Sequence, residues 1–274
     1  MMGNEPFVPT VTAAEVQAGI EHGEFAVHYQ PVISLHTGKL LSAEGLVRWR
    51  HPTLGMLAPG MFLPAVADAG LLAELGAWVL RTVCAQARIW QDAGIAVPCV
   101  GFNPSEEDLR PAYLRDLVRA ALDGAGIGPR LLVLELHEEV MADTQRAAQT
   151  LGELAALGVR LWIDDYGTGP SSLPLLEQFP FEILKIDRGD VSHITEDPGA
   201  ESAVASMIEL AQSMGMAVVA EGVVTQDQLA VLRRHGCDHI QGRLFSRPLE
   251  ADALSDFLVE GHAKDIDPLH MLRQ

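Results

Sequence analysis

From residue 97 onward, short apolar runs alternate with longer segments in which apolar residues recur at helical spacing. The runs cover residues 97–103, 131–136, 159–164, 181–187, 216–222 and 238–242. Each run is almost continuously apolar, which is typical of parallel strands that are covered on both faces. We therefore expect parallel strands here, with a helix between one strand and the next.

The segments between the runs have apolar residues at i, i+3, i+4 and i+7, which predicts amphipathic helices with one buried face. The expected buried positions are Leu114, Leu117, Val118 and Ala121, then Ala147, Leu151 and Leu154, then Ala203, Met207, Leu210 and Met214. Capping boxes and C-cap glycines are expected to mark the helix ends. The capping boxes are Ser105 with Asp108 and Thr225 with Gln228, and the glycines are Gly158, Gly215 and Gly236.

Two further strands are expected upstream, at residues 25–31 and 39–49, before a long helix that ends at Gly94. Eight strands, most of them followed by a helix, match a TIM-type (β/α)8 barrel, which typically takes about 250 residues. A doubly wound sheet would carry a glycine fingerprint after its first strand, and none is present. We predict one α/β barrel domain over residues 13–260, with loosely held ends at residues 1–12 and 261–274.

Composition excludes several classes of function. The chain carries 37 acidic and 19 basic residues, a formal charge of -18, whereas non-specific binding of DNA or RNA needs a basic surface. The three cysteines lie far apart in apolar segments, so neither a disulfide framework nor a zinc site is indicated. No secretion signal or long apolar span is visible, and we expect a cytoplasmic protein without membrane insertion.

Polar residues close the apolar runs, at the end of a barrel where chemistry collects. They are Asn103, Glu135, Asp164 with Asp165, Lys185, Glu221 and Gln241, and Glu44 lies within the second strand. So many carboxylates in one place repel each other unless cations are bound, and oxygen ligands favour Mg²⁺ or Mn²⁺ over zinc. The adjacent Asp164 and Asp165 suit two-metal phosphoryl transfer.

Simpler interpretations exist for each residue alone. A single acidic residue at a strand end is usually a solvated turn or a helix cap, and Glu135 and Glu138 would also suit the start of a helix. Lys185 would serve equally as an ion-pair partner inside the barrel, and we expect His137 to be a loop residue rather than a ligand. The joint placement on consecutive strand ends is what favours a functional site.

With these residues assembled, the sequence resembles the EAL-domain family, bacterial phosphodiesterases that hydrolyse cyclic di-GMP to linear pGpG. The resemblance runs from about Phe25 to Leu249 in the order of the family's motifs. The matching motifs are YQP at 29–31, ExLxR at 44–48, HP at 51–52, DDYGTG at 164–169, LKID at 184–187, AEGV at 220–223 and QGRLFSRP at 241–248.

The resemblance implies a role for each matching position. Ligands of a first metal would be Glu44, Asn103, Glu135 and Asp164, and ligands of a second would be Asp164 and Asp165 with Asp187 nearby. Lys185 would orient the attacking water with Glu221, and Glu138 would steady the loop after Asp165. Substrate contacts would come from Gln30, Leu46, Arg48 and Gln241, with Arg48 directed at a phosphate.

The resemblance also implies cofactors and partners. We expect two Mg²⁺ or Mn²⁺ ions per site, inhibition by Ca²⁺, cyclic di-GMP as the ligand, a homodimer and regulation by a separate protein.

This chain departs from the family pattern beside several matched positions, without losing a matched ligand or the lysine. Gly45 replaces the usual alanine, Pro104 a leucine, His137 a threonine, and Pro170 an aromatic residue. Gly189 with Asp190, and Arg243, are further departures. An active phosphodiesterase is therefore the leading hypothesis. A cyclic di-GMP receptor with little or no turnover, and a protein-interaction domain that no longer binds nucleotides, remain alternatives.

Overall fold

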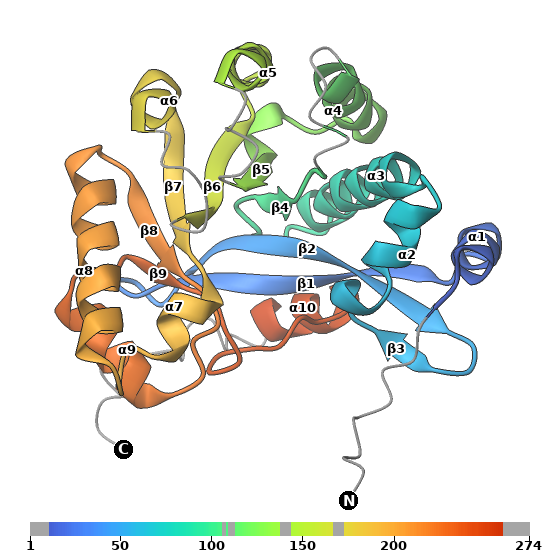
Figure 1. Cartoon of the computed structure of the whole chain (residues 1–274). Coiled ribbons are helices and arrows are strands. Elements are labelled where there is room, and N and C mark those ends of the chain that lie inside the picture. The colour runs from blue at the N-terminus through green and yellow to red at the C-terminus, as the bar shows by residue number, and fades with distance from the viewer. Residues whose placement is uncertain (1–10, 106–107, 109–112, 138–143, 167–172, 260–274) are drawn as a thin grey trace, which may run out of the picture.

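The computed structural model describes residues 11–105, 108, 113–137, 144–166 and 173–259, and eight of the described strands form a closed ring (Figure 1). The order around the ring is β1-β9-β8-β7-β6-β5-β4-β2, and pairing of β1 with β2 closes it. The strands are β1 (Phe25–Ser34), β2 (Leu40–His51), β4 (Val100–Phe102), β5 (Leu132–His137), β6 (Arg160–Tyr166), β7 (Phe181–Ile186), β8 (Ala217–Ala220) and β9 (His239–Ile240). The predicted TIM-type barrel is confirmed.

One strand departs from the usual all-parallel arrangement. Strand β1 runs antiparallel to both of its neighbours, β2 and β9, whereas the other ring pairs are parallel. The cause lies in the short connection at residues 35–39, because a parallel crossover needs roughly a dozen residues or more. A short strand that we did not expect, β3 (Gly55–Leu57), pairs with β2 outside the ring.

Most of the helices surround the ring, as Figure 1 shows for α3, α4, α5, α6 and α8. The α-helices are α1 (Ala13–Glu21), α2 (Leu63–Asp68), α3 (Leu72–Asp92), α4 (Tyr113–Ala125), α5 (Thr144–Leu157), α6 (Leu173–Gln178), α7 (Arg188–Ser192), α8 (Pro198–Ser213), α9 (Gln226–Arg234) and α10 (Ala251–Val259). The described residues also contain two short 3-10 helices, η1 (Pro59–Met61) and η2 (Pro129–Leu131). Within this part of the chain, no helix has the length and apolar character needed to cross a bilayer.

The predicted helix ends are largely confirmed. Thr225 and Gln228 form the expected capping box at the start of α9. The three expected C-cap glycines, Gly158, Gly215 and Gly236, have positive φ angles of 82°, 75° and 76°. Asp108 accepts hydrogen bonds from the backbone nitrogen and hydroxyl of Ser105, but the start of a helix there lies outside the described residues.

In α8, the prediction of the buried face was wrong by one residue: each buried side chain lies one position after the predicted one. The buried side chains are Val204, Ile208 and Ala211, whereas the predicted Ala203 is exposed and Met207 is only half-buried. Both sets have helical spacing, and the packing of α8 against the ring selects the one centred on branched side chains. In α5, Leu151 and Leu154 are buried as expected, and the side chain of Ala147 lies outside the described residues.

The barrel encloses an apolar cluster that is separate from the core between strands and helices. Its six buried members are Val32, Cys99, Val133, Trp162, Ile183 and Val219. Five of them lie on five different strands of the ring, and Cys99 directly precedes β4. Because alternate side chains of a strand point to the same face, the residues two positions farther along also point into the barrel.

Candidate functional site

The polar site lies one layer above this apolar cluster. A step of two residues leads from Val133 to Glu135 on β5, from Trp162 to Asp164 on β6, and from Ile183 to Lys185 on β7. The same step leads from Val219 to Glu221 at the end of β8. The period of the strands therefore delivers these side chains to the same depth of the barrel.

Lys185 is the centre of the site. Its side chain is 0% exposed, and its Nζ atom lies 2.5 Å from Glu221 Oε1, 3.3 Å from Asp164 Oδ2 and 3.5 Å from Glu44 Oε2. A fourth carboxylate, that of Glu135, accepts a hydrogen bond from the same ammonium. One positive charge therefore serves four carboxylates, which leaves an excess of negative charge inside the barrel.

Amide side chains hold Glu44 from two sides. Asn103 Nδ2 donates to Glu44 Oε1 at 2.7 Å, and Gln241 Nε2 donates to Glu44 Oε2 at 2.5 Å. Gln30 pairs with Glu44 across the β1–β2 ladder, and its Oε1 lies 3.4 Å from Gln241 Nε2. Two residues that lie far apart in the sequence, Asn103 and Gln241, thus fix the carboxylate of Glu44.

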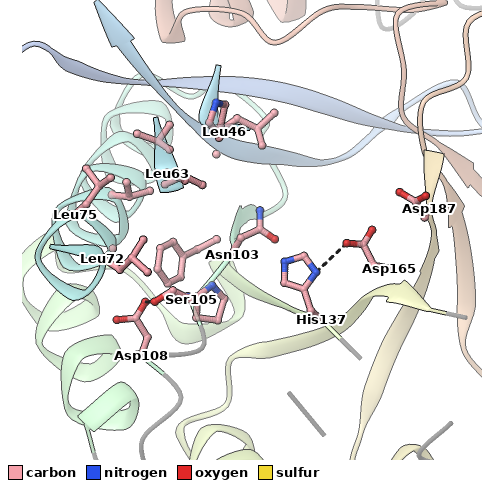
Figure 2. Close-up of a pocket in the computed structure, with 17 residues that line it drawn as sticks. Leu46, Leu63, Leu72, Leu75, Asn103, Ser105, Asp108, His137, Asp165 and Asp187 are labelled. Carbon is pink, nitrogen blue, oxygen red and sulfur yellow. Dashed lines mark hydrogen bonds and ion pairs between the residues drawn. The ribbon is translucent and has the colours of Figure 1, made fainter. Parts of the chain in front are cut away.

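Asp165 follows Asp164 in an unusual backbone conformation. Among the described residues, it is the one residue other than glycine with a positive φ, at 51°. Its backbone nitrogen donates to Asp164 Oδ1 at 3.0 Å, and its Oδ2 lies 3.0 Å from Nδ1 of His137 on β5. Figure 2 shows this imidazole pointing at Asp165. The left-handed turn directs both adjacent carboxylates toward the mouth of the barrel, and backbone strain of this kind clusters at functional sites.

The burial of the carboxylates shifts their protonation. Burial raises the pKa of Glu221 to about 8, and it raises the pKa of Asp164, although Lys185 opposes both shifts. Burial also raises the pKa of Glu135 well above its usual range. The pKa of Glu44 is lowered instead, because the attraction of Lys185 and the two amide hydrogen bonds outweigh its burial. Lys185 itself is held charged, since its carboxylate neighbours raise its pKa against the effect of burial.

The residues present fit divalent cations. Two buried oxygen atoms of the site, Glu135 Oε1 and Asn103 Oδ1, have no hydrogen-bond partner within the described part of the chain. Buried acceptors are rarely left unpaired, and oxygen donors around excess negative charge are what Mg²⁺ and Mn²⁺ bind. In addition, His137, Asp164 and Asp165 each offer one potential ligand atom, and these three atoms lie within 4.8 Å of one another.

Gly101 makes room for Glu135, a role that the sequence motifs do not indicate. A Cβ atom at Gly101 would lie 1.9 Å from Glu135 Oε1. Gly101 also occupies the inward position of β4, two residues after Cys99. We call the polar residues at this depth of the barrel, Glu44, Glu135, Asp164, Lys185 and Glu221, the acidic layer. A glycine that points inward at the depth of the acidic layer was the sequence signal for this role of Gly101.

A cavity of about 660 Å³ opens beside the acidic layer. Its polar lining includes Asn103, His137, Asp165 and Asp187, and its apolar lining includes Leu46 (Figure 2). Further apolar walls come from helices α2 and α3, through Leu63, Leu72, Leu75 and Val79. The cavity therefore joins anionic and apolar surfaces.

The other residues predicted for the site either make hydrogen bonds to backbone atoms or lie outside the described residues. Asp187 caps α7 by accepting from the backbone nitrogen of Gly189 at 2.6 Å, and a Cβ atom at Gly189 would lie 2.7 Å from the same Oδ1, so glycine fits at that departure. Arg48 lies two residues beyond Leu46 on β2, and its guanidinium donates to the carbonyl of Val47 at 2.8 Å. Glu138 and Pro170 lie outside the described residues.

The fold and the donor set define a TIM-type barrel with an oxygen-rich site suited to divalent cations at the carboxyl ends of its strands. The chain belongs to the EAL domain family, which matches residues 13–248.

Two curated relatives of this chain are named as cyclic di-GMP phosphodiesterases. The chain is 39% identical over 261 residues to the cyclic di-GMP phosphodiesterase NbdA of Pseudomonas aeruginosa, covering 95% of this chain and 33% of NbdA. It is 37% identical over 241 residues to the bifunctional diguanylate cyclase/cyclic di-GMP phosphodiesterase MucR of the same organism, covering 88% of this chain and 35% of MucR. The chain thus spans about a third of the length of these curated relatives.

A solved structure supports the fold match directly. The structure described as the PaMucR phosphodiesterase in complex with c-di-GMP superimposes with a TM-score of 0.85 at 37% identity, covering 88% of this chain and 98% of that chain.

Proposed function

We propose that this domain hydrolyses cyclic di-GMP to linear pGpG with the help of two divalent cations. The observation that carries the proposal is the site around Lys185, in which four carboxylates share one ammonium and two buried oxygens find no partner among the residues that the structure describes. The similarity to a phosphodiesterase solved with c-di-GMP supports the choice of substrate.

The first cation would be held by Glu44, Asn103, Glu135 and Asp164, and the second by Asp164, Asp165 and Asp187. Bound there, the cations would polarise the phosphoryl oxygens and lower the pKa of the attacking water. Because they also neutralise the carboxylates, a strongly acidic protein becomes able to accept an anionic ligand.

The side chains of the protein would position the reacting groups. Lys185 has three donors on a nitrogen that is fixed by its neighbours, so it is suited to orient a water molecule with Glu221. Gln30 and Gln241 lie against Glu44, where they would contact the substrate, and Leu46 offers an apolar surface to a base. Arg48 would turn its guanidinium toward a phosphate, and Glu138 would steady the loop after Asp165.

The direct test is incubation of the purified protein with cyclic di-GMP and Mg²⁺, Mn²⁺, Ca²⁺ or EDTA, followed by chromatography for pGpG. We expect product with Mg²⁺ or Mn²⁺ and none with Ca²⁺ or EDTA. Lys185→Ala and Asp164→Asn should abolish turnover while circular dichroism shows an intact fold. Arg234→Ala removes an ion pair with Glu201 on the outer helices and serves as the control. Turnover by Lys185→Ala close to that of the wild type would refute the assigned mechanism.

A receptor for cyclic di-GMP is the second candidate, favoured by the departures beside the site, among them Pro104 and His137 in the lining of the cavity. It predicts binding in a calorimeter without formation of pGpG. An interaction domain that no longer binds nucleotides predicts neither binding nor product. Homodimer formation, a separate regulatory protein and a cytoplasmic location stay predictions.

A further inference from the structure

We propose that His137 supplies a nitrogen ligand to the second cation, beside Asp165, so that this site is not built from oxygen donors alone. The inference rests on the proposed metal site. It concerns the one histidine at the mouth of the acidic layer among the described residues that line the cavity.

The position of His137 follows from the strand register. On β5 it lies two residues beyond Glu135, on the same face, and it pairs with Asp164 of β6 across the parallel ladder. The side chain is 43% exposed and lines the cavity that also contains Asp187. An incoming ion can therefore reach the ring nitrogen from the open side.

The distances suit coordination of one ion. For metal–ligand bonds of about 2.1 Å, neighbouring ligand atoms of an octahedron lie about 3.0 Å apart and opposite ones about 4.2 Å apart. The separation of His137 Nδ1 and Asp165 Oδ2 is 3.0 Å, and one atom each from His137, Asp164 and Asp165 lie within 4.8 Å of one another. The His137–Asp165 separation thus equals that of neighbouring ligands, and the 4.8 Å limit for the group lies somewhat above the octahedral maximum, so a small side-chain movement would bring all three atoms onto one ion.

The same imidazole has a second possible role, as a positioning residue that donates to Asp165 and leaves coordination to the carboxylates. The two roles differ in what they predict. A nitrogen ligand favours later transition metals over Mg²⁺, because imidazole raises affinity along the series from Mn²⁺ to Co²⁺. A hydrogen bond to Asp165 places no nitrogen on the metal.

The experiment uses the full chain labelled with ¹⁵N-histidine and loaded with ¹¹³Cd²⁺, a probe that accepts both nitrogen and oxygen ligands. Nuclear magnetic resonance then reports a direct cadmium–nitrogen bond as a splitting of the nitrogen signal. We expect this splitting in the wild type and its loss in His137→Thr, which restores the residue common in the family.

The matched control is His36→Thr, because His36 also faces a carboxylate, that of Asp238 at 3.4 Å, but in a surface pair away from the cavity. This variant should keep the splitting. In competition calorimetry, His137→Thr should lower the preference for Co²⁺ over Mg²⁺, because imidazole nitrogen favours the later transition metals, whereas loss of a hydrogen bond to Asp165 would weaken both metals alike.

Each outcome decides between the two proposals. Bound cadmium without a nitrogen splitting in the wild type, or a splitting that persists in His137→Thr, would overturn the role of His137 and leave the proposed metal site standing. Absence of bound cadmium, together with absence of bound Mg²⁺ or Mn²⁺, would overturn the metal site itself and the inference with it. If His137→Thr does not fold, His137→Gln removes the imidazole and answers the same question.

Discussion

Replacing Gly45 by alanine, the residue usual in the family, should destabilise this protein. Gly45 lies on β2 directly after Glu44, and a Cβ atom there would be 2.6 Å from Val83 Cγ2 and 3.1 Å from the carbonyl oxygen of Gly101. Real Cβ atoms essentially never approach another heavy atom as closely as 2.6 Å. Val83 on α3 is 0% exposed and is held by the core, so it has little room to move away.

The magnitude follows from two opposing effects. Forcing an extra methyl group into a packed core costs about 1–3 kcal/mol. Alanine restricts the unfolded chain more than glycine does, and this stabilises the folded protein by about 0.4–1 kcal/mol. We therefore expect Gly45→Ala to lower the free energy of unfolding by about 1.3 kcal/mol, and by no more than about 2.6 kcal/mol.

Urea unfolding of the metal-free protein measures this effect, and a double-mutant cycle tests its cause. Val83→Ala alone removes two buried methyl groups, at about 0.8 kcal/mol each before any cavity effect. In the double variant, the methyl group of Ala at position 45 occupies the space that the Val83 methyl groups leave. The double variant should therefore lose less stability than the two single variants lose together, by at least about 1 kcal/mol. Gly124→Ala is the control, because Gly124 lies in α4 with no atom of the described chain within 4 Å of its Cβ position, and the substitution should stabilise the helix. Additive losses in the cycle would refute the steric explanation.

Three further predictions concern the acidic layer. Gly101→Ala should abolish metal binding in calorimetry, because its Cβ atom would displace the carboxylate of Glu135, while a fold retained in circular dichroism would show that the effect is local. Saturating Mn²⁺, at 100 times its Kd, should raise the free energy of unfolding of the wild type by about 2.7 kcal/mol in urea titrations, and Asp164→Asn should lose most of this gain. Lys185→Ala should be destabilised more at pH 7 than at pH 5 in metal-free urea titrations. Burial raises the pKa of Glu135 and of Asp164, and removal of Lys185 takes away its opposing effect. The folded variant then binds protons that the unfolded chain releases near its usual carboxyl pKa of about 4, so stability falls as the pH rises, and equal destabilisation at both pH values would contradict this explanation.

The sequence predicted the ring and the acidic layer well because both depend on local periodicity. Strand runs and the residues that close them have a fixed relation, since alternate side chains share a face. The structure accordingly brings Glu135, Asp164 and Lys185 into contact, with Glu44 fixed by the amides that directly follow β4 and β9. Their chemical roles stay predictions until turnover is measured.

Other features could not be predicted because they depend on contacts between distant segments. The direction of β1 follows from the length of one turn and from its pairing with β9, and the apolar pattern of β1 is compatible with either direction. The choice between Ala203 and Val204 as the buried position of α8 depends on which helix face meets the ring. The space required by Glu135 at Gly101 becomes visible only when β4 and β5 are adjacent.

The pairing of β1 with β9 has a consequence for biosynthesis. Within this domain β1 is synthesised before β9, so a growing chain carries an unpaired edge of β1 until residues 239–240 have been made. The hydrogen bond from Gln241 to Glu44 joins segments on the two sides of this seam. Assembly of the site therefore coincides with completion of the barrel, and a chain truncated before β9 would lack both.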